Sequence, residues 1–219
     1  MRLTRIWTRR ARVARFGLVS FRAVNFLAHA YLARGSDRAI LGGVMGDFVK
    51  GPLDGRYDAE LTHALALHRR IDSYTDAHDV VRCSRRRVSP ARRRFAGILV
   101  DMFYDHFLAR LWEDYCDVPL EEFTAYVYAV LREHRAVLPE RLQQVAPRMA
   151  EGDWLTSYRR VEAVAAALDR MGGRLTRGKA ILRSGDELIA DYQAFEADFR
   201  LFFPDVVRFA RQSQGPGVN

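Results

Sequence analysis

The sequence has little cysteine and no long hydrophobic run. Two of its 219 residues are cysteines, Cys83 and Cys116, without a CxxC spacing and without a histidine cluster beside either one. We therefore expect reduced thiols in core positions rather than a disulfide scaffold, which favours a cytoplasmic protein. No window reaches about 18 uncharged apolar residues, so no membrane-spanning helix is predicted. The composition, 49% hydrophobic and 28% charged, excludes a disordered or collagen-like chain.

The first 23 residues contain no acidic side chain. They contain seven arginines, and the remaining chain has 28 basic and 27 acidic residues, so the formal charge of +8 arises almost entirely from this segment. A targeting segment, a disordered nucleic-acid-binding arm, or translated sequence upstream of the true start would each have this composition. The apolar run at 16–21 is too short for a signal peptide. We interpret residues 1–23 as a basic extension that precedes a true start at Val24.

Sustained strand-like alternation is absent, and apolar residues recur instead at three- and four-residue spacing. This periodicity predicts an all-α fold, with a single helical domain of about eight or nine helices over residues 24–213 and a flexible tail over 214–219. Gly35-Ser36-Asp37 is expected to end the first helix and begin the second, and Gly172-Gly173 is expected to end a later one. The clearest helical patterns span 58–75, 89–111, 154–171 and 179–203.

Acidic and histidine side chains lie among apolar neighbours at four places in the chain. Taken singly, each has a structural explanation: a satisfied core histidine, a capping acid, or a hydrogen bond within one helix. Two pairs, His68 with Asp72 and Asp101 with Asp105, have the four-residue spacing that places both side chains on one helix face. The complete set is His29, Asp47, His68, Asp72, Asp101, Asp105 and His106.

Three histidines and four aspartates from separate helices have the composition of a metal-hydrolase centre. Imidazole together with carboxylate suits Mn²⁺, Fe²⁺ or Zn²⁺, and additional oxygen ligands favour Mn²⁺ or Mg²⁺. Basic side chains close to these residues, Lys50, Arg69 and Arg70, could balance the charge of a phosphate group. We interpret the remaining histidines, His63, His78 and His134, as surface or capping residues.

Four segments together resemble the acyl carrier protein phosphodiesterase family in order and spacing. The resemblance extends from Val24 to about Phe203, and members of the family typically begin at the Asn-Phe-Leu-Ala-His segment, which supports a start at Val24. The segments are 24–33, 46–51, 68–72 with Thr75-Asp76, and Asp101 with 105–108.

The resemblance implies an HD-domain-like helical bundle and a divalent-metal phosphodiesterase, with Mn²⁺ the usual metal. It further implies a holo acyl carrier protein substrate, from which the 4′-phosphopantetheine arm is removed to give the apo protein. The implied metal ligands are His29, Asp47, His68 and Asp105. The implied catalytic residues are Asp47, His68, Asp72, Asp105 and His106. The HD dipeptide occurs here in reverse order, as Asp105-His106, and adjacent helix residues point about 100° apart.

A carrier protein is acidic, so an enzyme that acts on it should present a basic docking surface. The dense arginine cluster of residues 82–94 is the candidate, with a solvated helix end as the structural alternative. We expect substrate contacts from Lys50, Arg69, Arg86 and Arg93. Two other functions stay open at this point: an HD-type phosphohydrolase of a small nucleotide or other phosphodiester, and a basic helical nucleic-acid-binding protein.

Overall fold

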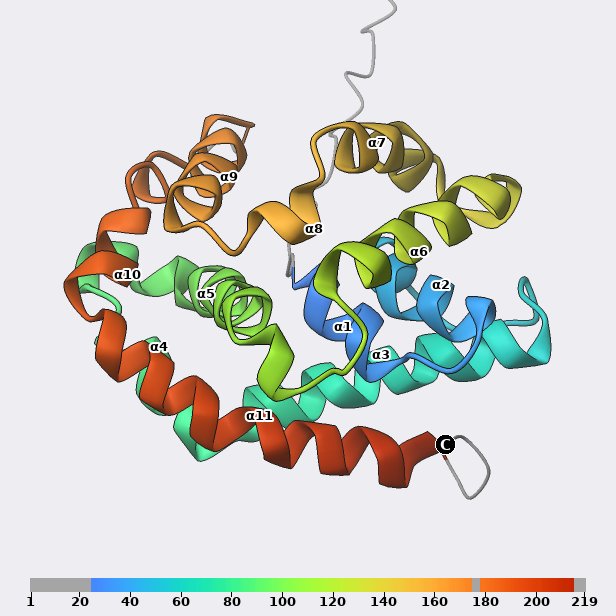
Figure 1. Cartoon of the computed structure of the whole chain (residues 1–219), viewed down its shortest axis with the longest axis horizontal. Helices are drawn as coiled ribbons and strands as arrows, with labels where there is room; N and C mark the ends of the chain where they lie inside the picture. The colour runs from blue at the N-terminus through green and yellow to red at the C-terminus, as the bar shows by residue number, and fades with distance from the viewer. Residues whose placement is uncertain (1–24, 175–177, 215–219) are drawn as a thin grey trace, which may run out of the picture.

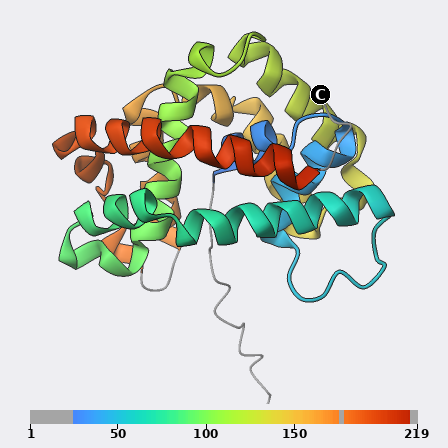
Figure 2. The same cartoon turned by 90° about the horizontal axis from the view of Figure 1, so that it is seen from below.

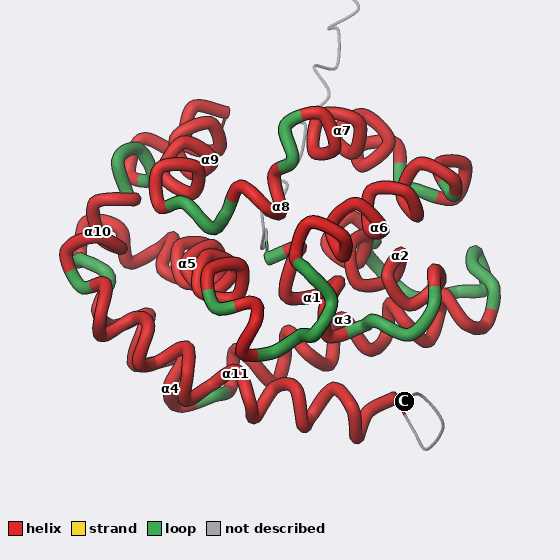
Figure 3. The backbone as a smooth tube through the Cα atoms, viewed as in Figure 1, coloured by secondary structure: helices red, strands yellow, loops and turns green. Residues whose placement is uncertain are grey.

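The computed structural model describes residues 25–174 and 178–214. The described residues form helices and loops without a strand (Figure 3), which confirms the all-α prediction. The predicted extension 1–23, the start at Val24 and residues 215–219 of the predicted tail lie outside the described residues. No helix of the described part is long and apolar enough to cross a membrane.

Eleven α-helices and five short 3₁₀ helices make up the described chain, more than the eight or nine helices expected. The α-helices are α1 (Phe26–Leu32), α2 (Asp37–Met45), α3 (Ala59–Ala77), α4 (Asp79–Arg87), α5 (Ala96–Arg110), α6 (Leu120–Glu133), α7 (Glu140–Glu151), α8 (Trp154–Ser157), α9 (Val161–Arg174), α10 (Gly185–Ala190) and α11 (Tyr192–Gln214). The 3₁₀ helices are η1 (Gly46–Phe48), η2 (Pro90–Phe95), η3 (Trp112–Asp114), η4 (Arg135–Val137) and η5 (Gly178–Ala180).

Capping side chains begin the two helices that flank the predicted site. The Ser36 hydroxyl accepts a hydrogen bond from the Ala39 amide at 3.1 Å and begins α2, as the Gly35-Ser36-Asp37 pattern predicted. The Asp58 carboxylate accepts from the Leu61 amide at 2.8 Å and begins α3. Both contacts satisfy amides that have no partner within their own helix.

The C-terminal part differs from the prediction in where its helices begin and end. The segment predicted as one helix over 179–203 contains α10 and most of α11, and α11 continues through Pro204 to Gln214. Gln214 was assigned to the flexible tail, but its side-chain amide donates to the Leu32 carbonyl at 2.8 Å. Helix α9 includes Gly172 and Gly173 and is described as far as Arg174. A Cβ atom on Gly172 would lie 3.0 Å from the Gly178 carbonyl oxygen, so this glycine permits close packing against η5.

The helices enclose one hydrophobic core with α1 near its centre (Figure 1). Helices α3 and α11 pack against each other along the lower side, and α5 crosses between them and the upper helices (Figure 2). Rings from α5 and α11, including those of Phe107, Phe199 and Phe203, fill the space between these elements. Both cysteines are free thiols, as predicted. The prediction that they occupy core positions is wrong, because Cys83 is exposed on α4 and Cys116 is half-buried.

Small residues bring α2 unusually close to both of its neighbours. A Cβ atom on Gly42 would lie 2.3 Å from the Cβ atom of Ala64 in α3. A Cβ atom on Gly43 would lie 2.7 Å from the carbonyl oxygen of His29 in α1. Since real Cβ atoms do not approach so closely, the two glycines are needed for α1 and α3 to pack so close to α2. This packing sets the separation of the histidines described next.

Candidate metal centre

Three of the predicted site residues meet between α1 and α3. One ligand atom from each of His29, His68 and Asp72 lies within 4.8 Å of the others. The Nε2 atom of His29 lies 3.1 Å from one Asp72 carboxylate oxygen, and the Nε2 atom of His68 lies 3.4 Å from the other. Asp47 of η1 adds a second carboxylate, 3.7 Å from His68 Nε2. Both imidazoles are 2% exposed and Asp72 is 30% exposed, so the cluster opens toward solvent on its carboxylate side.

The orientation of His68 is fixed by backbone and ring contacts. Its Nδ1–H donates to the Gly43 carbonyl at 2.9 Å, and because a carbonyl can only accept, Nε2 is the nitrogen that is left to bind a metal or, in its absence, a second proton. The ring stacks on His29 with a centroid separation of 3.9 Å. Neither His68 Nε2 nor either ring nitrogen of His29 has a hydrogen-bond partner among the described residues, although all three atoms are buried.

The unpartnered nitrogens fit a divalent metal. A buried polar atom without a partner costs free energy, and a cation held by the imidazoles would remove this cost for the nitrogen atoms that ligate it. Two imidazoles with one or two carboxylates form a donor set that suits Mn²⁺, Fe²⁺ or Zn²⁺. The cluster, with Asp47 beside it, therefore has the chemistry of a metal centre.

The charges of the cluster compensate one another. Burial, together with the charge of His68, lowers the pKa of His29. Burial also lowers the pKa of His68, but Asp47 and Asp72 outweigh it and raise that pKa to about 9. Burial raises the pKa of Asp72, and the two histidines outweigh it and hold that pKa below its ordinary value. In the metal-free protein a proton on His68 therefore balances the carboxylates at neutral pH.

Gly46 makes room for His68, a role that the sequence did not reveal. A Cβ atom on Gly46 would lie 2.3 Å from Cγ and 2.4 Å from Cδ2 of the His68 ring. The ring therefore occupies the volume that any other residue at this position would need. The glycine-rich context of Asp47 was the signal in the sequence, since it allows a close approach of another group, but it did not indicate which group approaches.

Asp101 of α5 is an acid whose pKa responds to the charges of the cluster. Burial raises its pKa to about 8; the charge of Arg85 opposes this rise, whereas Asp72 and Asp47 add to it. Arg85 itself bonds to Asp76 at 2.6 Å. The charges of Asp47 and Asp72 therefore act on the first acid of the Asp101–Asp105 pair, but Asp101 is not among the three residues whose ligand atoms meet in the cluster.

Asp105 does not join the cluster, in contrast to its predicted role as a metal ligand. Its carboxylate is 0% exposed, and its two oxygens accept hydrogen bonds from the backbone amides of Leu27 and Ala28 at 3.0 and 2.9 Å. Burial raises the pKa of Asp105, and the two amides oppose this rise. Both oxygens are thus used by the first turn of α1, and we omit Asp105 from the proposed ligands.

His106 also lies outside the cluster, and its ring bonds to Tyr158 and Tyr192 rather than to a residue of the predicted site. Its Nδ1–H donates to the Tyr158 carbonyl at 2.7 Å, and its Nε2 accepts from the Tyr192 hydroxyl at 2.9 Å. Burial lowers its pKa, which favours the neutral ring that this pattern needs. A neutral imidazole with both nitrogens bonded has no lone pair left for a metal or a water molecule. Both residues of the Asp105-His106 dipeptide therefore make hydrogen bonds within the fold and lie outside the metal cluster.

The basic residues predicted to contact substrate differ in their surroundings. The Arg69 guanidinium donates to the carbonyls of Val49 and Gly51, at 3.2 and 2.8 Å, and so fixes the loop that follows Asp47. Lys50, in that loop, is exposed, as are Arg86 and Arg93. The histidines predicted to lie outside the site do so: His63 is exposed, and His78 and His134 lie beside Asp205 and Asp37.

Comparison with known proteins assigns the chain to a family. A family model for acyl carrier protein phosphodiesterase matches residues 24–206, which include every residue of the cluster. The chain belongs to the acyl carrier protein phosphodiesterase family. It is 34% identical to the acyl carrier protein phosphodiesterases of Pectobacterium atrosepticum and Klebsiella pneumoniae, over 87% of this chain and the full length of each relative. It is 33% identical to that of Photorhabdus laumondii, over 83% of this chain and 92% of the relative. No solved structure matches.

Proposed function

We propose that the chain hydrolyses the phosphodiester that attaches 4′-phosphopantetheine to holo acyl carrier protein. The observation that carries the proposal is the cluster of His29, His68 and Asp72 in a chain of the acyl carrier protein phosphodiesterase family. Three of its buried nitrogens, both of His29 and Nε2 of His68, make no hydrogen bond to the described residues, and the cluster is exposed to solvent at Asp72. A phosphodiester could therefore approach the cluster from that side.

His29, His68 and Asp72 would hold the metal, with Asp47 as a further ligand, and Mn²⁺ is the metal that we propose. A divalent metal there would lower the pKa of bound water and polarise the phosphoryl group. The chain itself fixes the ligand geometry: Gly43 orients His68, the two imidazole rings stack, and Asp72 lies between their Nε2 atoms. Arg69 holds the loop after Asp47 in place rather than meeting the substrate directly.

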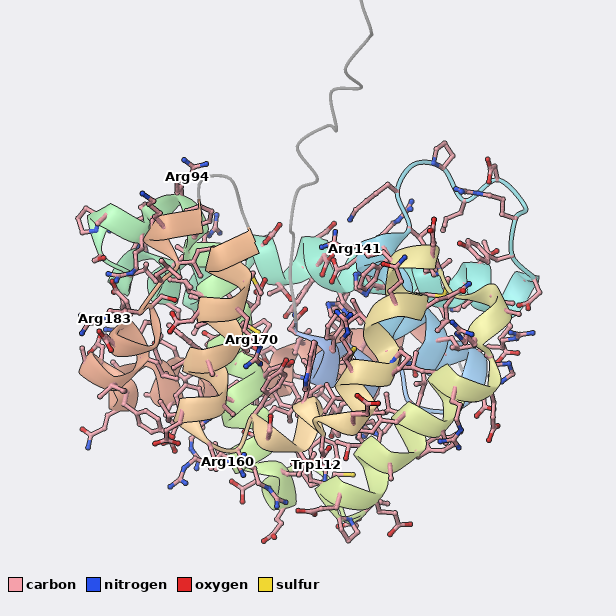
Figure 4. The ribbon with its side chains drawn as sticks, turned by 90° about the horizontal axis from the view of Figure 1, so that it is seen from above. Arg94, Trp112, Arg141, Arg160, Arg170 and Arg183 are labelled. Carbon is pink, nitrogen blue, oxygen red and sulfur yellow. The ribbon has the colours of Figure 1, made fainter. Side chains whose placement is uncertain are left out.

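We further propose that the exposed arginines of the 82–94 segment dock the acidic carrier protein. Four arginines of this segment bond to acidic residues of the chain itself and are thereby neutralised: Arg82, Arg85, Arg87 and Arg92. Arg86 donates to Cys83, whereas Arg93 and Arg94 have no acidic partner among the described residues. Figure 4 shows Arg94 on the same side of the molecule as Arg170 and Arg183, which come from other elements.

Charge reversal of two of these arginines is expected to weaken docking. We predict that the double variant Arg86→Glu/Arg93→Glu raises KM for holo acyl carrier protein about tenfold at low salt, with kcat nearly unchanged, because charges at the rim of an interface act on association. The matched control is Arg208→Glu, which reverses an exposed arginine on α11. Steady-state kinetics at two salt concentrations measure the effect, and equal KM values for both variants would contradict the docking surface.

A substrate comparison tests the proposed reaction against its alternatives. The full chain with Mn²⁺ is incubated separately with holo acyl carrier protein, with a small aryl phosphodiester and with a cyclic nucleotide. We expect loss of the arm from the carrier protein at a kcat/KM far above that for either small molecule. Faster turnover of a small phosphodiester would overturn the proposed substrate while keeping the hydrolase. Nucleic-acid binding without hydrolysis of any substrate would overturn the proposed function.

A further inference from the structure

Asp105, a buried carboxylate outside the metal centre, bonds to α1, the helix that contains His29. Helix α1 is seven residues long, and its N-cap residue, Asn25, makes no side-chain capping bond. The first amides of a helix have no partner within that helix. Asp105 of α5, far away in sequence, supplies two acceptors for the Leu27 and Ala28 amides. The start of α1 is therefore attached to α5 rather than to its own flanking residue.

This attachment lies directly beside His29. Ala28, whose amide bonds to Asp105, directly precedes His29, and the Nε2 atom of His29 lies 3.1 Å from Asp72. A short helix has little stability of its own, so external contacts decide where it lies. On the α2 side, the His29 carbonyl oxygen lies so close to Gly43 that a Cβ atom there would be 2.7 Å from it. Asp105 fixes the remaining end of α1.

We propose that Asp105 is a positioning residue: it holds the first turn of α1 so that His29 faces His68 and Asp72 at the distance that metal binding requires. Asp105 thus has a role of its own, because both of its carboxylate oxygens bond to the α1 backbone. This inference rests on the proposed metal centre but adds a residue that makes no contact with the metal. It also explains why a carboxylate is fully buried among apolar side chains.

The test compares Asp105→Asn with Asp198→Asn in the full chain. An asparagine at 105 offers one oxygen and one NH₂ group to two backbone donors, so one amide of α1 loses its partner. Asp198 is a matched buried carboxylate, 8% exposed, that accepts from Ser84 at 2.7 Å and Arg87 at 2.9 Å on α4. Both variants should lower the melting temperature of the metal-free protein, because each removes a buried acceptor.

Mn²⁺ affinity separates positioning from a purely structural role. We measure free Mn²⁺ by electron paramagnetic resonance during titration, at a temperature where circular dichroism shows each variant folded. Loss of a residue that orients a metal ligand typically costs about 10–100-fold in affinity. We expect a loss of this size for Asp105→Asn and an affinity within about twofold of wild type for Asp198→Asn. Equal affinities of Asp105→Asn and wild type would overturn the inference.

A second variant covers the case in which Asp105→Asn does not fold. Asp105→Glu keeps the charge and both acceptors but displaces them by one methylene group, so a positioning role again predicts weaker Mn²⁺ binding and a structural role predicts wild-type binding by the folded protein. The wild-type titration is done first. Absence of Mn²⁺ binding by the wild type would refute the proposed metal centre itself, whereas normal wild-type binding with an unaffected Asp105→Glu variant would refute only the positioning role.

Discussion

Replacing Gly46 by alanine is expected to abolish Mn²⁺ binding and hydrolysis together. The added methyl group would lie 2.3 Å from His68 Cγ, and the ring cannot move away freely because it stacks on His29 and bonds to the Gly43 carbonyl. The clash must therefore displace either the imidazole or η1 with Asp47. Overpacking of this kind typically costs about 1–3 kcal/mol of stability, so the folded variant can be purified and titrated.

Gly173→Ala is the matched control for this prediction. Gly173 lies near the end of α9, and a Cβ atom there would meet no atom within 4 Å. We expect wild-type Mn²⁺ affinity and activity for this variant, together with unchanged or slightly raised stability, because alanine favours helix more than glycine does. Calorimetric Mn²⁺ titration of both variants measures the difference. Normal metal binding by Gly46→Ala would show that His68 is not a ligand in the orientation described.

Replacing Asp72 by asparagine is expected to have the second large effect. The substitution keeps the shape of the side chain but removes the carboxylate that lies between the Nε2 atoms of His29 and His68. The metal would lose an anionic ligand, and the pKa of His68 would fall because part of the charge that raises it is gone. We expect Mn²⁺ affinity to fall by more than the roughly 10–100-fold that loss of an outer partner costs.

Asp79→Asn controls for the removal of one negative charge. Asp79 is 92% exposed at the start of α4 and pairs with Arg82, outside the metal centre. Its Mn²⁺ affinity and its kcat on holo acyl carrier protein should equal those of wild type, because exposed pairs contribute little. If Asp72→Asn retained wild-type affinity, the ligand set would have to be rebuilt around Asp47 and Asp101.

The fold class could be predicted from the sequence, but the helix ends near the C-terminus could not. Helical periodicity is a local signal, and it identified α3 almost to its ends because Asp58 caps it. The break between α10 and α11 has no glycine or proline to mark it, and Pro204, which does suggest an end, lies inside α11. There, packing of the aromatic face of α11 against α5 outweighs the local preference.

The three residues that meet in the cluster were among those singled out in the sequence, but their arrangement and the separate partners of Asp105 and His106 were not predictable. Spacing correctly placed His68 and Asp72 on one face of α3, because both belong to the same helix. The same spacing suggested a common role for Asp101 and Asp105, but their partners come from other helices, and a sequence does not show which backbone amide lies opposite a side chain. The role of Gly46 depends likewise on a ring 22 positions away.

The most direct test of the metal centre is the mass of holo acyl carrier protein after incubation with the full chain. The account predicts that the carrier loses its 4′-phosphopantetheine arm with Mn²⁺ present, and keeps it with EDTA or with the Asp72→Asn variant. Release of the arm at an equal rate in EDTA, or by Asp72→Asn at the wild-type rate, would contradict the assignment of hydrolysis to the cluster of His29, His68 and Asp72.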